Sequence, residues 1–233
     1  MAVKVRNLYT AVKILRGKGP STSREREPVV RDGGAQRRAD AVRNREAILS
    51  AGLEVLSRQP DAGLGEIARA SGLTRTTVYA HFATREELLE ELLRRAVAET
   101  TRMIDASDPG SGPADVALLR VLAASWQHVA ELAGLTDLVA RALDDRAAEL
   151  HAPIQERLSA LVRRGRRDGT FRRDVSQRWL LTTYFALVHA AGREVMLGAS
   201  SLDVAEHALR RTLLGAFAPA PPGGAATARR PRR

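Results

Sequence analysis

Residues 63–92 read GLGEIARASGLTRTTVYAHFATREELLEEL, and this stretch decides the fold that the sequence predicts. Ala68 is small enough for two helices to cross closely, Gly72 suits the left-handed backbone of a tight turn, and Val78 would anchor the second helix on the first. This spacing is typical of a helix-turn-helix, which places its second helix in the major groove of DNA. The stretch therefore predicts two short helices joined by a turn at Gly72.

The second helix of this pair has a predicted inner side and a predicted outer side. Thr74 is a good N-cap, and with Val78 directed inward, Phe82 follows one turn later on nearly the same side. The outer side is polar, rich in hydroxyls and free of acid, and it comprises Arg75, Thr76, Thr77, Tyr79 and Ala80. Arginine and threonine can bind base edges, and tyrosine can donate to phosphate, so we predict that this side contacts DNA. Arg85, just after the helix, is placed for a backbone phosphate.

Helical patterns extend on both sides of this motif. Upstream, apolar residues at helical spacing predict a helix over about residues 37–57. Downstream, Thr84 and Glu87 form a capping box for a long helix that ends near Ile104. The composition of residues 108–113, DPGSGP, predicts a linker. Five more helical stretches follow it, at residues 114–132, 136–143, 147–167, 176–197 and 203–217.

No segment alternates with a period of two for long, so the predicted fold class is all-α without a sheet. The predicted organisation is an unstructured basic extension over residues 1–36, a three-helix helix-turn-helix domain over 37–98, a C-terminal helical domain over 99–217, and a basic tail over 218–233. The helix at 176–197 is apolar on two sides, and both sides must be buried. One side faces its own domain, and the other is a candidate subunit interface.

The distribution of charge along the chain does not by itself predict sequence-specific binding to nucleic acid. The net charge is +10, but residues 1–38 carry +7, residues 39–98 carry −1, residues 99–217 carry 0 and the tail carries +4. Basic ends raise affinity for any phosphate backbone without distinguishing sequences. The prediction of specific DNA binding therefore depends on the helix-turn-helix itself.

Several classes of protein are disfavoured by composition. The chain has no cysteine, so disulfide frameworks, thiolate metal sites and cysteine nucleophiles are excluded. The histidines show no metal-ligand spacing, and no catalytic arrangement can be inferred, so we expect no metal, no cofactor and no enzyme activity. The longest uncharged apolar run, residues 179–192, is too short to span a bilayer, and the N-terminus lacks the apolar core of a signal peptide. These features predict a cytoplasmic protein.

The motif closely resembles the signature of the TetR family of transcriptional regulators over about residues 40–98. The residues that carry the resemblance around the second helix are Thr74, Thr77, Val78, Tyr79, His81, Phe82, Thr84, Arg85, Glu86, Glu87 and Leu88. Two positions depart from the pattern: Gly63 stands where the family often has a Ser or Thr cap, and Ala80 is small at a variable position. Beyond the motif, the resemblance is one of helical layout only.

The resemblance implies roles for the matching residues. The residues expected to contact phosphates and bases are Thr77, Tyr79, His81 and Arg85. The residues expected to set specificity are Arg75, Thr76 and Ala80. Thr74, which would cap the second helix, is also expected to lie at the DNA. It also implies a homodimer through the last two helices and a small-molecule effector that binds the C-terminal domain. Effector binding would move the fourth helix and release a double-stranded DNA operator, which is a shift between two populated states. Residues that are candidates to line the effector pocket are Trp126, His128, Trp179, Tyr184, Phe185 and His189.

Alternatives stay open at this point. Each aromatic or histidine of the candidate pocket is by itself more often ordinary core, and the arginine run at 163–167 is more often a solvated helix end than a second DNA patch. For the whole chain, the alternative to a ligand-responsive repressor is a small-molecule-binding or interaction protein with a vestigial helix-turn-helix. A helical enzyme is a third hypothesis, which no residue pattern supports.

Overall fold

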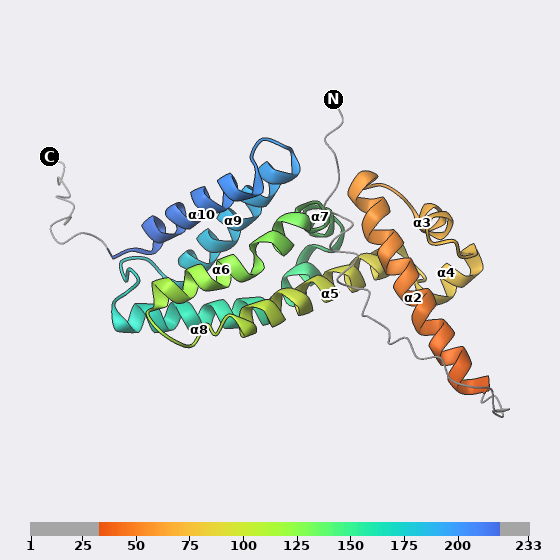
Figure 1. Ribbon diagram of the computed structural model, residues 1–233, viewed down its shortest axis with the longest axis horizontal. Coiled ribbons are helices and arrows are strands. Elements are labelled where there is room, and N and C mark those ends of the chain that lie inside the picture. The colour runs from red at the N-terminus through yellow and green to blue at the C-terminus, as the bar shows by residue number, and fades with distance from the viewer. Residues whose placement is uncertain (1–32, 220–233) are drawn as a thin grey trace, which may run out of the picture. The chain divides into compact units, whose positions relative to one another are not determined.

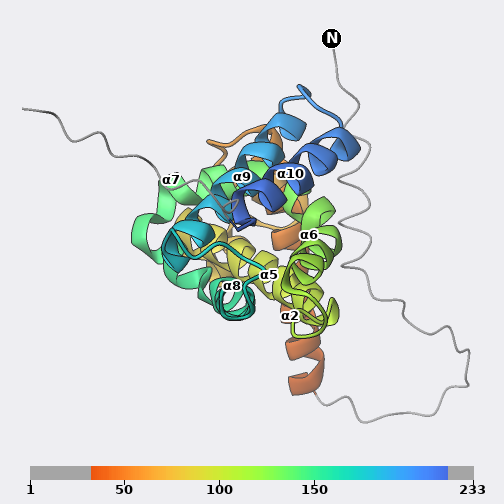
Figure 2. The same ribbon diagram turned by 90° about the vertical axis from the view of Figure 1, so that its left-hand side faces the viewer.

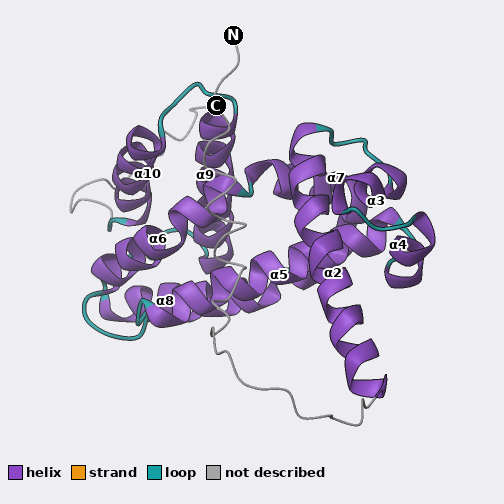
Figure 3. Cartoon of the chain, turned by 45° about the vertical axis from the view of Figure 1, so that its right-hand side comes forward, coloured by secondary structure: helices purple, strands orange, loops and turns teal. Residues whose placement is uncertain are grey.

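The computed structural model describes residues 33–219 of the chain, and this range consists of helices joined by loops, with no strand (Figures 1 and 3). The predicted all-α fold is confirmed. Within this range, residues 33–99 and 128–152 form one compact unit, and residues 100–127 and 153–219 form a second. The boundary between the two units lies inside the long helix, and residues 128–152 group with the N-terminal helices, which a linear division of the chain did not anticipate. The predicted domain boundaries stay a prediction.

The first unit contains the predicted helix-turn-helix. Its helices are α2 (Gly33–Arg58), α3 (Leu64–Ser71), α4 (Arg75–His81), the N-terminal part of α5 (Arg85–Ala106), and α7 (Ala133–Leu150). Their shared core contains residues with almost no exposed surface, among them Ile48, Ile67, Val78 and Leu88. These residues come from α2, α3, α4 and α5, so the core of the unit holds the helix-turn-helix in place.

The start of α2 is earlier than predicted. The helix begins at Gly33 rather than near residue 37, and residues 34–43 are exposed. The Gln36 amide donates to Asp40 across 3.2 Å, and Arg38 Nε donates to the Gly34 carbonyl across 3.3 Å. Such contacts four residues apart stabilise a helix that has little packing. The remainder of the predicted basic extension and most of the predicted tail lie outside the described residues.

The second unit contains most of the remaining helices (Figure 2). They are α6 (Ala114–Glu131, whose last turn groups with the first unit), α8 (Ala152–Asp168), α9 (Gln177–Met196) and α10 (Leu202–Phe217). Ser176 caps α9 by accepting from the Trp179 amide at 3.1 Å, and Ser201 caps α10 by accepting from the Val204 amide at 3.3 Å. Side-chain oxygens at these positions satisfy backbone donors that the first turn leaves unpaired.

The boundary between α7 and α8 lies further along the chain than the sequence analysis expected. The expected helices at 136–143 and 147–167 are instead Ala133–Leu150 and Ala152–Asp168. Pro153 explains the position of the break, because proline lacks an N–H and is tolerated in the first turn of a helix but not in its interior. The expected break at 144–146 was therefore wrong.

The second unit is closed by a tight contact at Gly165 of α8. The Phe171 amide donates to the Gly165 carbonyl across 2.8 Å, and the Arg172 amide donates to the Phe217 carbonyl across 2.9 Å. The rings of Phe171 and Phe217 meet edge to face, with centroids 5.2 Å apart. The loop after α8 thereby joins α8 to the end of α10.

Two of the four arginines in the run at 163–167 bind backbone carbonyls of nearby loops. Arg164 donates to the carbonyls of Gly112 and Pro109, the latter at 2.9 Å, and Arg166 donates to the carbonyl of Val175. These two guanidinium groups hold the loop between α5 and α6 and the loop between α8 and α9. The remaining arginines, 163 and 167, are exposed. Part of the run therefore binds the protein's own backbone, which favours the structural interpretation over a second DNA patch.

Among residues 33–219, no helix combines the length and the apolar character that crossing a membrane requires. The same part of the chain contains no group of three or more acidic or histidine side chains that could hold a metal ion.

Candidate nucleic-acid interface

The turn between α3 and α4 is built on Gly72. Its φ of 70° and ψ of 13° place it in the left-handed region that glycine adopts without a steric penalty. The Leu73 amide donates to the Ala68 carbonyl across 3.2 Å, which closes the end of α3. Ala68 is buried, and Val78 has no exposed surface. The predicted turn at Gly72 and the predicted burial of Val78 are confirmed.

Helix α4 begins at its predicted cap. The Thr77 amide donates to Thr74 Oγ1 across 3.1 Å, and the two threonine hydroxyls lie 2.8 Å apart. Helix α5 is capped next to it: the Glu87 amide donates to Thr84 Oγ1 across 3.1 Å, and the Glu87 carboxylate accepts from the Ala83 amide across 2.8 Å. These caps fix the residues at which α4 and α5 begin. The outer side of α4 therefore lies between two defined helix starts.

The outer side of α4 is exposed in the phase that the sequence predicts. Tyr79 keeps 53% of its surface exposed, whereas Val78 and Phe82 are buried. The other exposed candidates are Thr74, Arg75, Thr76 and Ala80, and the half-buried ones are Thr77, His81 and Arg85. All of the predicted DNA-contacting residues are therefore at least partly accessible. That they contact DNA stays a prediction.

Arg85 differs from the other candidates, because its guanidinium binds the protein. Arg85 Nε donates to the Ala62 carbonyl across 3.1 Å, and Nη2 donates to the Pro60 carbonyl. These carbonyls belong to the loop between α2 and α3. Arginine has five donors, so some remain for a phosphate. The structure nevertheless gives Arg85 a role in holding the loop that precedes α3.

Replacing Arg85 with Ala is expected to lower the free energy of unfolding by about 1–2 kcal/mol, because hydrogen bonds to a charged donor stabilise more than neutral ones and these are only half-buried. Urea denaturation measures the change. Arg58→Ala is the matched control: Arg58 is exposed and forms an ion pair with Glu54 within α2 at 3.2 Å, so we expect a change within about 0.5 kcal/mol. Unchanged stability of the Arg85 variant together with weaker DNA binding would show that the loop contacts are incidental.

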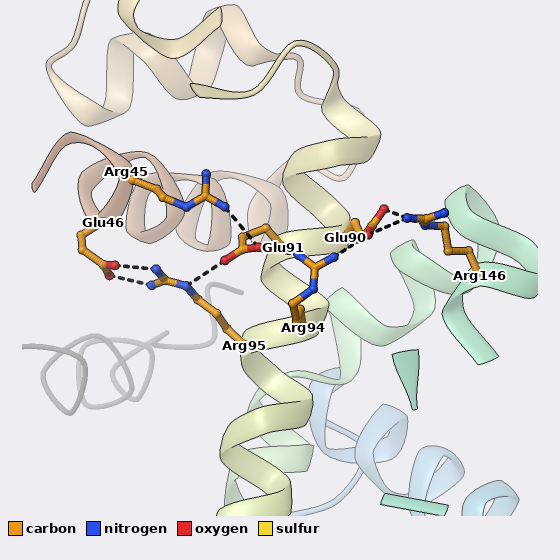
Figure 4. A network of polar contacts seen from close by, with 7 residues as sticks. All are labelled: Arg45, Glu46, Glu90, Glu91, Arg94, Arg95 and Arg146. Atoms are coloured by element: carbon orange, nitrogen blue, oxygen red, sulfur yellow. Dashed lines mark hydrogen bonds and ion pairs between the residues drawn. The ribbon is translucent and has the colours of Figure 1, made fainter. Parts of the chain in front are cut away.

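A network of charged side chains connects α2, α5 and α7 within the first unit (Figure 4). Arg95 of α5 forms a bidentate pair with Glu46 of α2, with one N–O distance of 2.6 Å. Arg45 lies 3.2 Å from Glu91. On the other side of α5, Arg146 of α7 donates to both carboxylate oxygens of Glu90, at 2.8 and 3.0 Å. Arg94 of α5 binds both Glu90 and Glu91.

The electrostatic effect of the network favours the charged form of its acids. The hydrogen bond from Arg95 lowers the pKa of Glu46 below its usual value, and burial opposes this shift. The hydrogen bond from Arg146 likewise lowers the pKa of Glu90. Both carboxylates therefore stay ionised at neutral pH, and the pairs they form with arginine hold the first turns of α5 between α2 and α7.

The candidate effector residues are only partly brought together. The ring of Phe185 meets those of Tyr184, at 5.6 Å, and His189, at 6.4 Å. Tyr184 is buried, and desolvation raises the pKa of its hydroxyl far above the usual value. Tyr184 and Phe185 are adjacent in α9 and His189 follows one turn later, so the three rings form one cluster that carries a hydroxyl and an imidazole.

The other candidates lie elsewhere. Trp126 is 2% exposed, and its indole Nε1 donates to the Leu202 carbonyl across 3.1 Å, so it connects α6 to the start of α10. Trp179 of α9 is 60% exposed. His128 belongs to the first compact unit. The roles of these three residues in an effector pocket stay predictions.

The helix-turn-helix is the part of the chain that matches a known family model. The family model for bacterial regulatory proteins of the tetR family matches residues 48–92, which include the core of α2, all of α3 and α4, and the start of α5. The helix-turn-helix of this chain is therefore similar to those of the tetR family of bacterial regulatory proteins. It is 44% identical over 80 residues to the HTH-type transcriptional repressor LfrR of Mycolicibacterium smegmatis, a match that covers 34% of this chain and 42% of LfrR. The sequence match thus spans less than half the length of that relative.

Solved TetR-family structures resemble more of the chain. The structure of LfrR from Mycobacterium smegmatis in complex with proflavine has a TM-score of 0.61 and 26% identity, covering 76% of this chain and 98% of that one. The structure of FadR from Bacillus subtilis in complex with stearoyl-CoA has a TM-score of 0.65 and 16% identity, covering 73% and 98%. The second comparison shows the fold alone.

Gly63 departs from the TetR pattern, and a hydrogen bond from its own amide partly replaces the missing side-chain cap. Gly63 has no side chain to cap α3, but its own amide donates to the carboxylate of Glu66 across 2.7 Å. This is half of a capping box, and the carboxylate also suits the positive end of the helix. A glycine at the cap costs only a few tenths of a kcal/mol relative to Ser or Thr.

Sequence reasoning about the TetR motif did not find the ion pairs that cross between helices. Glu90 with Arg94 and Glu91 with Arg95 are four apart, a spacing that is visible in the sequence. The pairs with Glu46 and Arg146 join residues 49 and 56 positions apart, and no periodic pattern marks them. The same holds for the contacts of Arg85 with the loop before α3.

Proposed function

We propose that this chain is a sequence-specific DNA-binding transcriptional regulator of the TetR type, acting as a homodimeric repressor that a small molecule releases from its operator. The observation that carries the proposal is the exposed outer side of α4. It holds Thr76 and Tyr79 in a register that also buries Val78, so the helix can enter a major groove without disturbing the core. The similarity to LfrR, which is named a repressor, supports the direction of regulation.

The effector is proposed to be an organic molecule with a large apolar surface. LfrR was solved with proflavine and a FadR with stearoyl-CoA, both of which have extended apolar parts. In this chain, the cluster of Tyr184, Phe185 and His189 offers aromatic faces beside a few polar atoms, which is the composition of a small-molecule site. Helix α5 carries residues of both compact units, so it is the element through which effector binding would change the population of DNA-binding conformers.

The homodimer is proposed to form through α9 and α10. These helices pack on each other with one face each, where Leu180, Val188, Leu209 and Leu213 are buried. Large apolar side chains remain exposed on the same two helices or directly after α9, and they are Trp179, Met196, Leu197 and Val204. Exposed apolar groups of this size favour association with another protein surface. A second copy of the chain would bury them by symmetry.

The test is the affinity of the purified chain for fragments of its own promoter region and for random DNA of equal length, at physiological salt. Selective binding in the nanomolar range supports the proposal, since specific affinities are typically about 10⁻⁸–10⁻¹¹ M. Equal and weak binding to both would leave only nonspecific attraction, and a vestigial helix-turn-helix would then be the better account.

Replacing Tyr79 with Ala is expected to weaken operator binding about tenfold, because a polar contact at a DNA interface contributes roughly 1–3 kcal/mol. The far-UV spectrum and the dimer mass are expected to stay the same, since Tyr79 is exposed. Tyr79→Phe separates the hydroxyl from the ring: loss in both variants assigns the effect to the hydroxyl. Affinity of Tyr79→Ala within about twofold of the original would show that the outer side of α4 is not the DNA-contacting surface.

A further inference from the structure

Arg75 has an unusual neighbour in the helix-turn-helix. It is the first residue of α4, and its guanidinium lies against Gly65 in the first turn of α3. A Cβ on Gly65 would lie 3.2 Å from Arg75 Nη2 and 3.4 Å from both Cζ and Nε. Three atoms of the planar guanidinium are thus almost equally distant from that point. The group presents its face to the bare Cα of Gly65.

This contact decides the direction of the Arg75 side chain. A residue at the start of α4 can extend along the outer side of the recognition helix, toward bases, or turn back toward α3. Arg75 turns back. In a helix-turn-helix, the first helix crosses the sugar-phosphate backbone, and the start of the second helix meets the base edges. A guanidinium that lies on α3 is therefore directed toward the backbone, where charge and not base identity is recognised.

The charges around this place favour an anionic partner. Arg75 remains exposed, and the nearest acid of α3, Glu66, is occupied by the Gly63 amide at 2.7 Å and faces Arg69 at 3.7 Å. A phosphate would accept from the guanidinium with the planar, two-pronged geometry that arginine offers.

We propose that Gly65 is a positioning residue for DNA binding. The absence of a side chain at Gly65 lets the Arg75 guanidinium rest on α3, and from there Arg75 binds a phosphate of the operator backbone. This inference rests on the proposed DNA-binding function and changes one part of the earlier expectation, in which Arg75 was a specificity residue. Sequence discrimination would then come from Thr76, Thr77 and Tyr79.

The experiment uses the full chain in four forms: Gly65→Leu, Arg75→Ala, the double variant, and Ala70→Leu as the matched control. Leucine at Gly65 fills the place where the guanidinium lies, and Ala70 is exposed on the same helix at a different angular position. Binding is measured on the promoter fragment and on a shuffled duplex across a series of salt concentrations. Thermal unfolding of each form is recorded in parallel.

Arg75→Ala is expected to weaken both duplexes by the same factor and to reduce the slope of log affinity against log salt by about 0.9, which is the contribution of one phosphate contact. Gly65→Leu is expected to reproduce this change, and the double variant to add nothing. Ala70→Leu is expected to bind like the original chain. Leucine is a better helix former than glycine, so Gly65→Leu is expected to unfold at the same or a higher temperature. A purely structural role for Gly65 would give a lower one.

Two results would overturn the inference. Loss of binding to the promoter fragment alone in Arg75→Ala would show that Arg75 recognises bases. Losses that add in the double variant would show that Gly65 acts independently of Arg75. If the original chain binds both duplexes equally, the proposed sequence-specific function fails, but the salt slopes on the shuffled duplex still decide whether Arg75 binds phosphate.

Discussion

Phe82→Ala is expected to lower the free energy of unfolding of the helix-turn-helix unit by about 3–5 kcal/mol, the cost of deleting a fully buried aromatic ring. Phe82 is 2% exposed and lies at the end of α4, where its amide donates to the Val78 carbonyl across 2.9 Å. The Arg45 guanidinium lies over the ring, 4.7 Å from its centroid. The variant therefore loses apolar burial and a cation–π contact together, and α4 loses its anchor at the C-terminal end.

Hydrogen exchange of peptides that cover α3 and α4 measures this effect locally, and urea denaturation measures it for the chain. Phe82→Leu is expected to cost less than about 1.5 kcal/mol, because it keeps most of the buried volume. Tyr79→Ala is the control for losing an aromatic ring in the same helix, and because Tyr79 is exposed, we expect a change of about 0.5 kcal/mol or less. A similar loss in Phe82→Ala and Tyr79→Ala would contradict the assigned inner and outer sides of α4.

Gly165→Leu is expected to destabilise the second unit by about 3 kcal/mol or more, at the upper end of overpacking effects. A Cβ on Gly165 would lie 2.3 and 2.6 Å from two ring carbons of Phe171 and 2.8 Å from the Ala114 Cβ. Phe171 has no room to yield, because it is buried and its ring meets that of Phe217 at 5.2 Å. The gain in helix propensity from replacing glycine, about 1 kcal/mol, is too small to offset this.

Gly215→Ala is the matched control for the propensity term. Gly215 lies inside α10, and a Cβ there would meet no atom within 4 Å. We expect it to raise stability by about 0.5–1 kcal/mol, and Gly165→Ala to lower it by about 2 kcal/mol. Denaturation at one fixed protein concentration keeps any contribution from subunit association equal. An increase in stability for Gly165→Ala would show that the loop after α8 can move away from the helix.

The order of α3, turn and α4 was predictable from a few residues that favour turns or helix caps. Gly72 adopts the positive φ that its type predicts, Thr74 caps α4, and Thr84 caps α5. The turn conformation and each cap depend on interactions within four residues, so the neighbouring residues in the sequence are enough to predict them. The break between α7 and α8 was placed wrongly because a run of charged residues is compatible with helix, whereas Pro153 marks the actual start of α8.

The candidate DNA-contacting surface was predictable in outline for the same reason. A period of 3.6 residues and one inward Val78 decide which side chains of α4 face out, and the exposure of Tyr79 agrees with that phase. Which of the candidate effector residues are buried was not predictable, because burial depends on packing between different helices. Trp126 and Trp179 are both aromatic, yet one lies in the core and the other is exposed, and residue type alone does not distinguish them.

The amino-acid sequence alone determined the fold class and the helix-turn-helix, because short-range spacing and capping encode them. Only the tertiary structure decided what individual arginines do. Arg85 binds the loop before α3, Arg95 and Arg146 hold α5 between α2 and α7, and Arg75 rests on Gly65. Arginine is long, flexible and always charged, so its partner depends on which carbonyl, carboxylate or bare Cα the fold brings within reach, and that is a property of packing between distant segments.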